Sequence, residues 1–344
     1  MNFCSDNITG AATEILDAII GNNARPLMPY GADDITTRVE AHFTEIFERD
    51  CTVFLVATGT AANALALAAI TPPWGSIVCH HKSHINVSEC GAPEFFTGGA
   101  KLIALRGADA RLAPQDVFAA GVPAPHGVHG VQPAALSLTQ ATEAGTIYTP
   151  ADLAALTGAA RKRGLKVHMD GARFANAVAA LGIPPADLSW RAGVDVLSFG
   201  ASKNGALAAE AVIFFDPELA ETFAYRRKRA GHLFAKMRLL AVQMEAYLTN
   251  DLWLRFARHA NIMAERLAAG LAGLPGAALV HPRESNQVFI DLPEAVIVGL
   301  EAAGFAFYRW GAADTTCIRL VCAFDTRPED VDALIARAAR LSAT

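Results

Sequence analysis

The segment that decides the fold is Leu197-Ser198-Phe199-Gly200-Ala201-Ser202-Lys203-Asn204-Gly205, in which an apolar run ends in a turn of small residues that carries Lys203. Such a lysine is suited to forming an imine with a carbonyl cofactor, because burial lowers its pKa from about 10.4 and releases the nucleophilic amine. Gly200, Ser202 and Gly205 leave room for a flat ring beside it. An isolated lysine is most often a surface residue, so the interpretation depends on two motifs upstream.

These two motifs supply what pyridoxal phosphate needs besides a lysine. Thr58-Gly59-Thr60-Ala61-Ala62-Asn63 predicts a helix that begins at a glycine, and backbone NH groups at a helix start bind phosphate. Val167-His168-Met169-Asp170-Gly171-Ala172-Arg173 places Asp170 at the end of an apolar strand, where a buried carboxylate needs a partner such as a protonated pyridine nitrogen. Separately, the first motif also fits an ordinary capped helix, and Asp170 also fits a helix cap or an ion pair with Arg173.

Short apolar runs alternate with helical patterns along the first part of the chain. They cover residues 52–56, 76–79, 101–105, 135–138, 165–169, 194–199 and 211–215. This alternation predicts an α/β domain with a mostly parallel sheet. Ligands bind beyond the carboxyl ends of the strands in such sheets, so we expect Thr58, Asp170 and Lys203 to converge there.

The second part of the chain predicts a smaller domain. One helical stretch from about Pro217 to Leu248 has a basic and an apolar face and is expected to lead out of the first domain. Beyond it, the patterns predict helices near residues 251–274, 293–303 and 327–341 and strands near 278–281, 287–291 and 316–321. We therefore expect residues 1–248 to form an N-terminal segment and a large cofactor-binding domain, and residues 249–344 to form a small α+β domain.

Composition excludes several classes of protein. The chain has 344 residues, of which 52% are hydrophobic and 18% charged, as is typical of a globular enzyme. A net charge of −5 and a single short basic run, residues 226–229, argue against a nucleic-acid partner. Six scattered cysteines without a CxxC pair indicate neither a disulfide scaffold nor a zinc ribbon. Without a signal-peptide pattern or a membrane-spanning apolar run, we expect a cytoplasmic protein.

Together these motifs resemble those of the low-specificity L-threonine aldolases, pyridoxal phosphate enzymes of fold type I, the aspartate-aminotransferase fold. The resemblance covers nearly the whole chain and rests on the motifs above together with Ser5-Asp6-Asn7-Ile8-Thr9, Tyr30-Gly31-Ala32-Asp33-Asp34, His84 and Ile318-Arg319-Leu320-Val321. It implies a lyase that cleaves L-threonine, L-allo-threonine or related β-hydroxy-α-amino acids into glycine and an aldehyde.

The resemblance also implies roles for individual residues. For the cofactor, the implied residues are Lys203 as imine partner, Asp170 at the ring nitrogen, His84 stacked on the ring, Arg173 near the phenolic oxygen, and Gly59, Thr60 and Ser202. For the substrate the implied residues are Ser5, Tyr30, Arg173 and Arg319. The residue type agrees for Arg319, because a planar guanidinium suits bidentate binding of a carboxylate. Active sites of this fold lie at subunit interfaces, so we expect a homodimer or homotetramer in which Arg229 reaches a neighbouring subunit's phosphate.

One segment departs from the commoner family pattern. Where many members have a histidine in Glu-Asn-Thr-His-Asn-Gly, this chain has Thr139-Gln140-Ala141-Thr142-Glu143-Ala144-Gly145, so that Glu143 stands in the histidine's place. A carboxylate can accept the β-hydroxyl proton directly or through water. Glu143 is therefore the expected base, and the preference between threonine and allo-threonine stays open.

Other interpretations remain. A phenylserine aldolase is close behind, and a β-eliminating lyase or an aminotransferase would share the fold. A non-catalytic binding module is disfavoured because Lys203 and Asp170 are both present, and a dinucleotide site because Thr58 to Asn63 lacks the GxGxxG spacing. Cys79-His80-His81 with His84 is the best metal candidate, but His84 is already assigned to the cofactor ring, so we predict no metal site.

Overall fold

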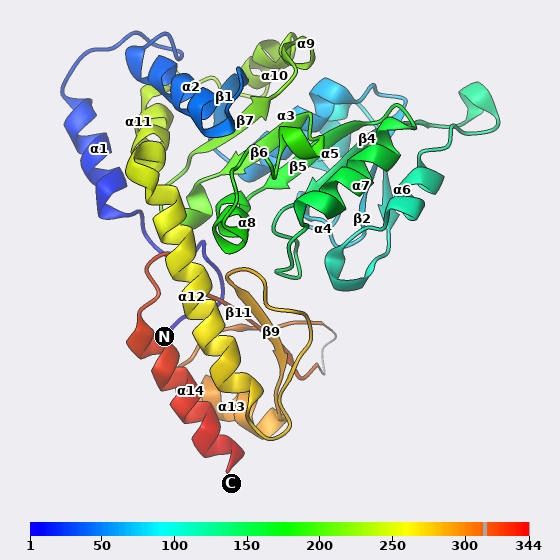
Figure 1. Ribbon diagram of the computed structural model, residues 1–344. Coiled ribbons are helices and arrows are strands. Elements are labelled where there is room, and N and C mark those ends of the chain that lie inside the picture. The colour runs from blue at the N-terminus through cyan, green and yellow to red at the C-terminus, as the bar shows by residue number, and fades with distance from the viewer. Residues whose placement is uncertain (312–314, 344) are drawn as a thin grey trace.

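A large, mostly parallel sheet forms the upper part of the molecule in Figure 1, a computed structural model that describes residues 1–311 and 315–343. Within these residues its strands are β1 (Thr52–Val56), β2 (Gly75–His80), β3 (Lys101–Leu105), β4 (Gln132–Thr139), β5 (Lys166–Gly171), β6 (Val196–Gly200) and β7 (Glu210–Phe214). Their order is β1-β7-β6-β5-β4-β2-β3. The pairs from β6 to β3 are parallel, whereas β7 runs antiparallel to both neighbours. The strands and the mostly parallel sheet predicted from the sequence are confirmed.

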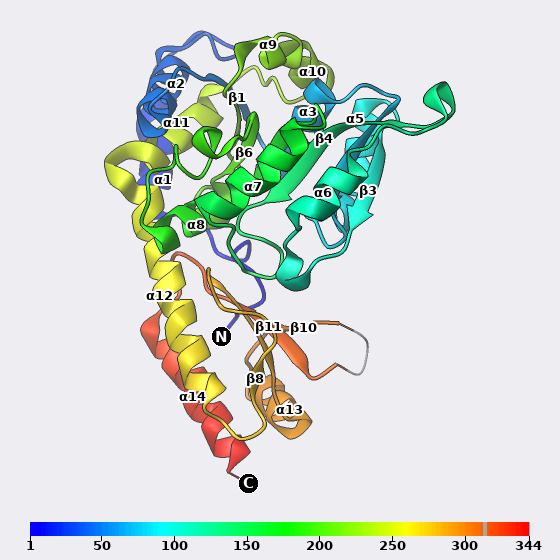
Figure 2. The ribbon, with the colours of Figure 1, turned by 45° about the vertical axis from the view of Figure 1, so that its right-hand side comes forward.

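Helices cover both faces of this sheet, and each face has its own apolar core. One core packs α3 (Gly59–Ile70) against strand residues such as Val212 and Phe214. Because nine residues of α3 are buried, this helix is apolar nearly all round, as expected of an internal helix. On the other face the core gathers α2 (Asp34–Phe47), α7 (Pro150–Arg161) and α8 (Phe174–Leu181), and Figure 2 shows α7 in front of the sheet.

Most of the other helices before residue 252 are short. They are α1 (Thr13–Asn23), α4 (His84–Val87), α5 (Ala92–Thr97), α6 (Pro114–Ala120) and the 3₁₀ turns η1 (Ala108–Ala110), η2 (Gly127–His129), η3 (Trp190–Ala192), η4 (Ser202–Asn204) and η5 (Thr249–Asp251). Of these, α4 and η4 follow strands at the edge where the site forms.

The stretch predicted as one helix from Pro217 to Leu248 is broken, so that prediction is wrong in its continuity. It contains α9 (Pro217–Ala220), α10 (Phe223–Arg229) and α11 (Arg238–Leu248). Gly231, with φ 77°, ends α10 in the left-handed conformation that glycine adopts without a Cβ penalty. The predicted apolar face is nevertheless present, since Met237, Leu240 and Met244 are buried.

A second, antiparallel sheet lies below the first, and α12 (Leu252–Ala272) runs from one to the other (Figures 1 and 2). Its order is β10 (Tyr308–Arg309), β11 (Cys317–Val321), β9 (Gln287–Asp291) and β8 (Ala278–Leu279), and α13 (Glu294–Ala302) and α14 (Pro328–Ser342) pack beside it. Strand β10 has no counterpart in the sequence prediction.

The N-terminal residues lie beside this second sheet rather than the first. Asn2 forms a bridge with Ala306, and Phe3 is buried in the core of the small domain. The predicted boundary between residues 248 and 249 falls between α11 and η5 and stays a prediction.

Candidate active site

A cavity of about 830 Å³ is lined by residues of both domains. Strands β2, β4, β5 and β6 run parallel, so their carboxyl ends meet at one edge of the large sheet, and residues that follow them line the cavity together with residues of the small domain. The structure brings these predicted site residues together: Ser5, His84, Glu143, Arg173, Lys203 and Arg319.

Close backbone packing brings the turn of Lys203 against the end of β5. A Cβ added to Gly200 would lie 2.7 Å from the carbonyl oxygen of Ala172, so only glycine permits this approach. A hydrogen bond to α11 also holds the turn in place, because Asn204 Nδ2 donates to Tyr247 Oη at 2.7 Å. Burial, reinforced by the charge of Arg173, lowers the pKa of Lys203. The lysine therefore has the environment that favours a free amine.

Asp170 is the last residue but one of β5, and its side chain is buried, with the residue 3% exposed. Its Oδ2 accepts a hydrogen bond from Asn63 Nδ2 at 2.9 Å, and its Oδ1 accepts one from the backbone NH of Ala172 at 3.0 Å. Both donors are neutral, and within the described residues no cation lies in ion-pair range of Asp170. A buried carboxylate held in this way suits a cationic ring nitrogen.

His84 is fixed to the same network through a buried acid. Its Nδ1 lies 2.7 Å from Glu89 Oε1, which also accepts from Asn63 Nδ2 at 2.8 Å. The hydrogen bond to Glu89 raises the pKa of His84. The imidazole is thereby held at the cavity wall, and Asn63 joins its partner Glu89 to Asp170.

Glu143 presents one unpartnered oxygen in this site. Its Oε1 accepts hydrogen bonds from the backbone NH of His84 and from Thr139 Oγ1, both at 2.9 Å. Its Oε2 is buried and has no hydrogen-bond partner in the described chain. Burial and the charge of Asp170 raise the pKa of Glu143 to about 7. A carboxyl group with such a pKa is poised to accept or release a proton near neutral pH.

Arg173 is paired within the chain. Its Nε and Nη2 donate to Asp6 Oδ2 and Oδ1 at 2.7 and 2.8 Å, in the bidentate geometry typical of guanidinium and carboxylate. Burial by itself would raise the pKa of the Asp6 carboxyl, but the charge and the hydrogen bonds of Arg173 outweigh burial and lower that pKa. This pair holds the N-terminal segment, including Ser5, at the cavity.

Arg319 lacks such a partner. Its Nε and Nη2 donate to the neutral amide oxygen of Gln287 at 3.2 and 3.0 Å, and its guanidinium carbon lies 5.1 Å from the centre of the Trp310 ring. Burial, together with the charge of Arg173, lowers the pKa of Arg319 to about 10. Among the described residues no carboxylate lies within ion-pair distance of it, so it can bind a carboxylate from a ligand.

The start of α3 can hold a phosphate. Thr58 caps the helix through its Oγ1, which accepts from the NH of Ala61 at 3.2 Å. The NH groups of Gly59 and Thr60 precede the first helical hydrogen bond, and a Cβ on Gly59 would meet nothing within 4 Å. Open space before free NH groups at a helix start suits an anion.

Six predicted site residues are not among those that line the cavity: Asp170, Gly59 and Thr60, described above, and Tyr30, Ser202 and Arg229. Tyr30 is 50% exposed, and Lys228 Nζ lies 5.0 Å from its ring centre. Arg229 is exposed at the end of α10. Ser202 Oγ accepts from the NH of Ala209 at 3.2 Å. Their predicted roles stay predictions.

Sequence reasoning missed several residues of the site. Asp6 and Asn63 stand inside motifs quoted above but were given no role, and Glu89 lies five residues beyond His84. Gln287 and His281 line the cavity from the small domain, and no local pattern marks either of them.

The described residues contain neither a metal-binding cluster nor a helix that could span a membrane. Among residues 1–311 and 315–343, no group of three His, Cys, Asp or Glu side chains could hold a metal ion. Along the same residues, no helix is both long and apolar enough to cross a membrane.

Comparisons with known proteins agree with this geometry. A family model described as "Beta-eliminating lyase" matches residues 2–295. The chain is 44% identical over 332 residues to a Pseudomonas aeruginosa protein named "Low specificity L-threonine aldolase", covering 96% of this chain and 94% of that protein. A solved threonine aldolase structure from Leishmania major superposes with a TM-score of 0.93 at 29% identity and covers 99% of both chains.

The fold is also that of more distant enzymes. An aspartate aminotransferase from Thermus thermophilus superposes with a TM-score of 0.69 over 97% of this chain and 89% of its own, and its 17% identity shows the fold alone. The predicted aspartate-aminotransferase fold is therefore confirmed.

Proposed function

Since the chain belongs to the low-specificity L-threonine aldolases, within the beta-eliminating lyase family, we propose that it cleaves L-threonine, L-allo-threonine or related β-hydroxy-α-amino acids into glycine and an aldehyde. The observation that carries this proposal is that Lys203, Arg319 and Glu143 line one cavity, and that Glu143 Oε2 has no hydrogen-bond partner among the described residues. A lyase for β-hydroxy amino acids needs an attachment point for the amine, a cation for the carboxylate and a base for the hydroxyl.

The family depends on pyridoxal phosphate, and the residues of this chain fit that cofactor. When bound, pyridoxal phosphate supplies an aldehyde for attachment to amines and a protonated ring that draws electrons from the Cα–Cβ bond. Lys203 Nζ would hold the aldehyde carbon, Asp170 the proton on the ring nitrogen, and the NH groups of Gly59 and Thr60 the phosphate. Two observations support this placement of the cofactor. Asp170 accepts hydrogen bonds only from uncharged donors, and the space before the start of α3 is open.

The substrate is bound and deprotonated by other residues. Arg319 binds the carboxylate through its guanidinium, and Arg173, fixed by Asp6, adds positive charge. Glu143 Oε2 accepts the β-hydroxyl proton, so that the Cβ–O bond becomes the carbonyl of the leaving aldehyde. His84, held by Glu89, stands at the cavity wall, where it can stack on the cofactor ring.

Glu143→Gln is expected to lower kcat for cleavage of the preferred diastereomer by at least about tenfold, because an amide cannot accept the proton. Aldehyde release from purified wild type and variant, assayed with L-threonine, L-allo-threonine and L-phenylserine, measures this. An unchanged rate with every substrate would remove Glu143 from the mechanism.

The rate should also depend on pH through this group. Because burial raises the pKa of Glu143 to about 7, the carboxylate forms only as the pH rises through that value. We expect kcat/KM to fall about tenfold per pH unit below about pH 7 and to level off above it. The measurement is a profile of kcat/KM between about pH 5.5 and pH 9. A flat profile in the wild type would contradict the assignment.

Aromatic β-hydroxy amino acids are a second candidate substrate class. Tyr308 and Trp310 line the cavity and are 50% and 40% exposed, so they can pack against a phenyl group at Cβ. This is why L-phenylserine belongs in the assay. Release of benzaldehyde faster than acetaldehyde would place the enzyme in that class.

We also propose that the enzyme is a homodimer or homotetramer in which Tyr30 and Arg229 serve a neighbouring subunit's site. Both residues are exposed and lie outside the cavity lining of their own chain. Arg229 forms no ion pair with any described residue, so its charge is available to a phosphate on a neighbouring subunit.

A further inference from the structure

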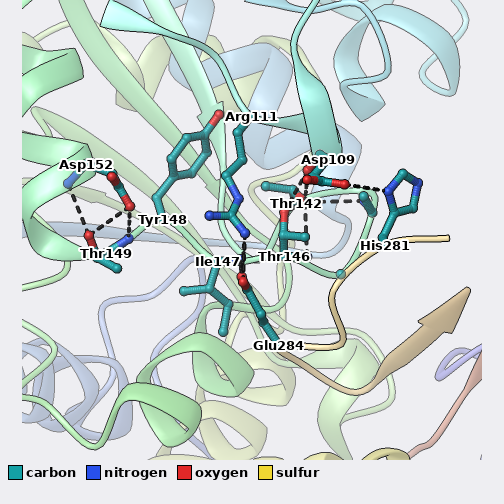
Figure 3. Close-up of polar contacts among 12 residues, drawn as sticks. Asp109, Arg111, Thr142, Thr146, Ile147, Tyr148, Thr149, Asp152, His281 and Glu284 are labelled. Carbon is teal, nitrogen blue, oxygen red and sulfur yellow. Dashed lines mark hydrogen bonds and ion pairs between the residues drawn. The ribbon is translucent and has the colours of Figure 1, made fainter. Parts of the chain in front are cut away.

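An aspartate–histidine pair lies at the cavity and has no part in the mechanism above. His281 Nδ1 is 2.8 Å from Asp109 Oδ1 (Figure 3). Asp109 belongs to η1 of the large domain, whereas His281 follows β8 of the small domain. The histidine side chain is 14% exposed and lines the same cavity as Lys203 and Glu143.

The pair fixes both the orientation and the tautomer of the imidazole. Asp109 accepts a hydrogen bond from Nδ1–H, which leaves the lone pair of the neutral ring on Nε2. The ring also makes an edge contact with Phe289, with centres 5.4 Å apart. In Figure 3 the second nitrogen points away from Asp109, and no described residue makes a hydrogen bond to it. Nε2 is therefore free to accept a hydrogen bond from a ligand in the cavity.

Asp109 is joined to the loop that carries Glu143. Its backbone is left-handed, with φ 54° and ψ 33°, and its carbonyl oxygen accepts a hydrogen bond from Thr146 Oγ1 at 2.7 Å (Figure 3). Thr142 Oγ1 lies 2.7 Å from Thr146 Oγ1, so these two threonines enclose Glu143 and its neighbours in one tight loop. The cavity thus has two proton acceptors, Glu143 from the large domain and His281 from the small domain, tied to one another through Asp109.

Two acceptors match a chemical need of an aldolase with low specificity. L-Threonine and L-allo-threonine differ only in configuration at Cβ, so with Cα and the carboxylate fixed, their hydroxyl groups point in different directions. We propose that His281 Nε2, oriented by Asp109, accepts the β-hydroxyl proton of one diastereomer, while Glu143 accepts that of the other. This inference rests on the proposed function and adds the residue that makes cleavage tolerant of either configuration.

The proton and electron changes balance without another reactant. The proton passes from the β-hydroxyl oxygen to Nε2, and the resulting imidazolium is stabilised by the Asp109 carboxylate. The Cβ–O bond becomes the carbonyl of the aldehyde as the Cα–Cβ bond breaks, and the electron pair of that bond stays with the glycine fragment. The proton then returns to Cα of that fragment, which leaves His281 neutral.

A purely structural tie between the domains is the competing explanation, and the chain offers a matched control for it. Arg111 Nη2 donates to Glu284 Oε1 and Oε2 at 2.7 and 2.8 Å, and Glu284 Oε2 also accepts from the NH of Ile147 at 2.6 Å (Figure 3). This tie joins nearly the same segments as His281 and Asp109, but Arg111 and Glu284 do not line the active-site cavity.

The experiment compares kcat/KM for L-threonine and L-allo-threonine in wild type, His281→Asn, His281→Phe, Glu284→Gln and Glu143→Gln. Asparagine can keep a hydrogen bond to Asp109 at the place of Nδ1 but has no group at the place of Nε2. We expect His281→Asn and His281→Phe to change the ratio of the two kcat/KM values by at least about tenfold, because each variant removes the base that serves one diastereomer. Glu143→Gln is expected to move the ratio in the opposite direction, and Glu284→Gln to leave it unchanged.

Two results would overturn the assignment of His281 alone. One is an unchanged ratio in both His281 variants, and the other is an equal shift in Glu284→Gln, which would make the pair a domain tie. If wild type releases aldehyde from neither diastereomer, the proposed function fails and this inference fails with it.

Discussion

Lys203→Ala is expected to abolish aldol cleavage, with a loss in kcat on the order of 10³-fold or more. Lys203 is the buried amine of the cavity, and burial already lowers its pKa. Without Nζ the cofactor loses its covalent attachment, and the exchange of one amine for another that precedes bond cleavage is lost. The variant should therefore also lose the absorbance band near the visible edge that a lysine-bound cofactor gives.

Lys82 provides the matched control for this prediction. It lines the same cavity but is exposed, and nothing buries its ammonium group. Lys82→Ala should keep the absorbance band, and borohydride reduction followed by peptide mapping should label Lys203 in both wild type and this control. A Lys203→Ala protein that keeps wild-type cleavage would show that another group holds the cofactor.

Asp170→Asn is expected to lower kcat by about 10² to 10³, the range seen when one preorganised electrostatic group of an active site is removed. The carboxylate is 3% exposed and accepts only neutral donors, so its charge is available to keep a ring nitrogen protonated. An amide carries no such charge and would also place an NH₂ group opposite Asn63 Nδ2. Steady-state kinetics with saturating cofactor separate this loss from weaker cofactor binding.

Asp195→Asn separates the chemical role of Asp170 from general damage to the sheet. Asp195 immediately precedes β6, and its Oδ2 accepts a hydrogen bond from the NH of Val167 at 2.7 Å, at the opposite end of β5 from Asp170. We expect this control to lower the melting temperature with little change in kcat. Equal losses of kcat in the two variants would assign Asp170 a structural role only.

Much of the large domain could be predicted from sequence because its signals are local. Apolar runs identify the strands, and residues that follow parallel strands share one edge, which is why Thr58, Asp170 and Lys203 could be placed together. Glu143 was placed by its position in the family pattern. The break at Gly231 was missed because one glycine in an otherwise helical pattern does not by itself end a helix.

The rest of the site depends on contacts between distant parts of the chain. Asp6 pairs with Arg173, and Asp109 with His281, across 167 and 172 residues respectively. No periodicity or spacing rule reports such a pairing, since it depends on how the small domain sits on the large one. The sequence signal of such contacts is limited to charged side chains that stand inside or close to a quoted motif, as Asp6 and Glu89 do.

The most direct test of the proposed aldolase function is the product balance of the purified, cofactor-loaded protein acting on L-threonine and L-allo-threonine. We expect glycine and acetaldehyde in equal amounts, without ammonia, because in the proposed mechanism Arg319 holds the substrate carboxylate while Glu143 takes the β-hydroxyl proton and the Cα–Cβ bond breaks. Ammonia with 2-oxobutanoate would instead show elimination at Cβ, and it would contradict the proposed aldolase function while leaving the fold and the cofactor site in place.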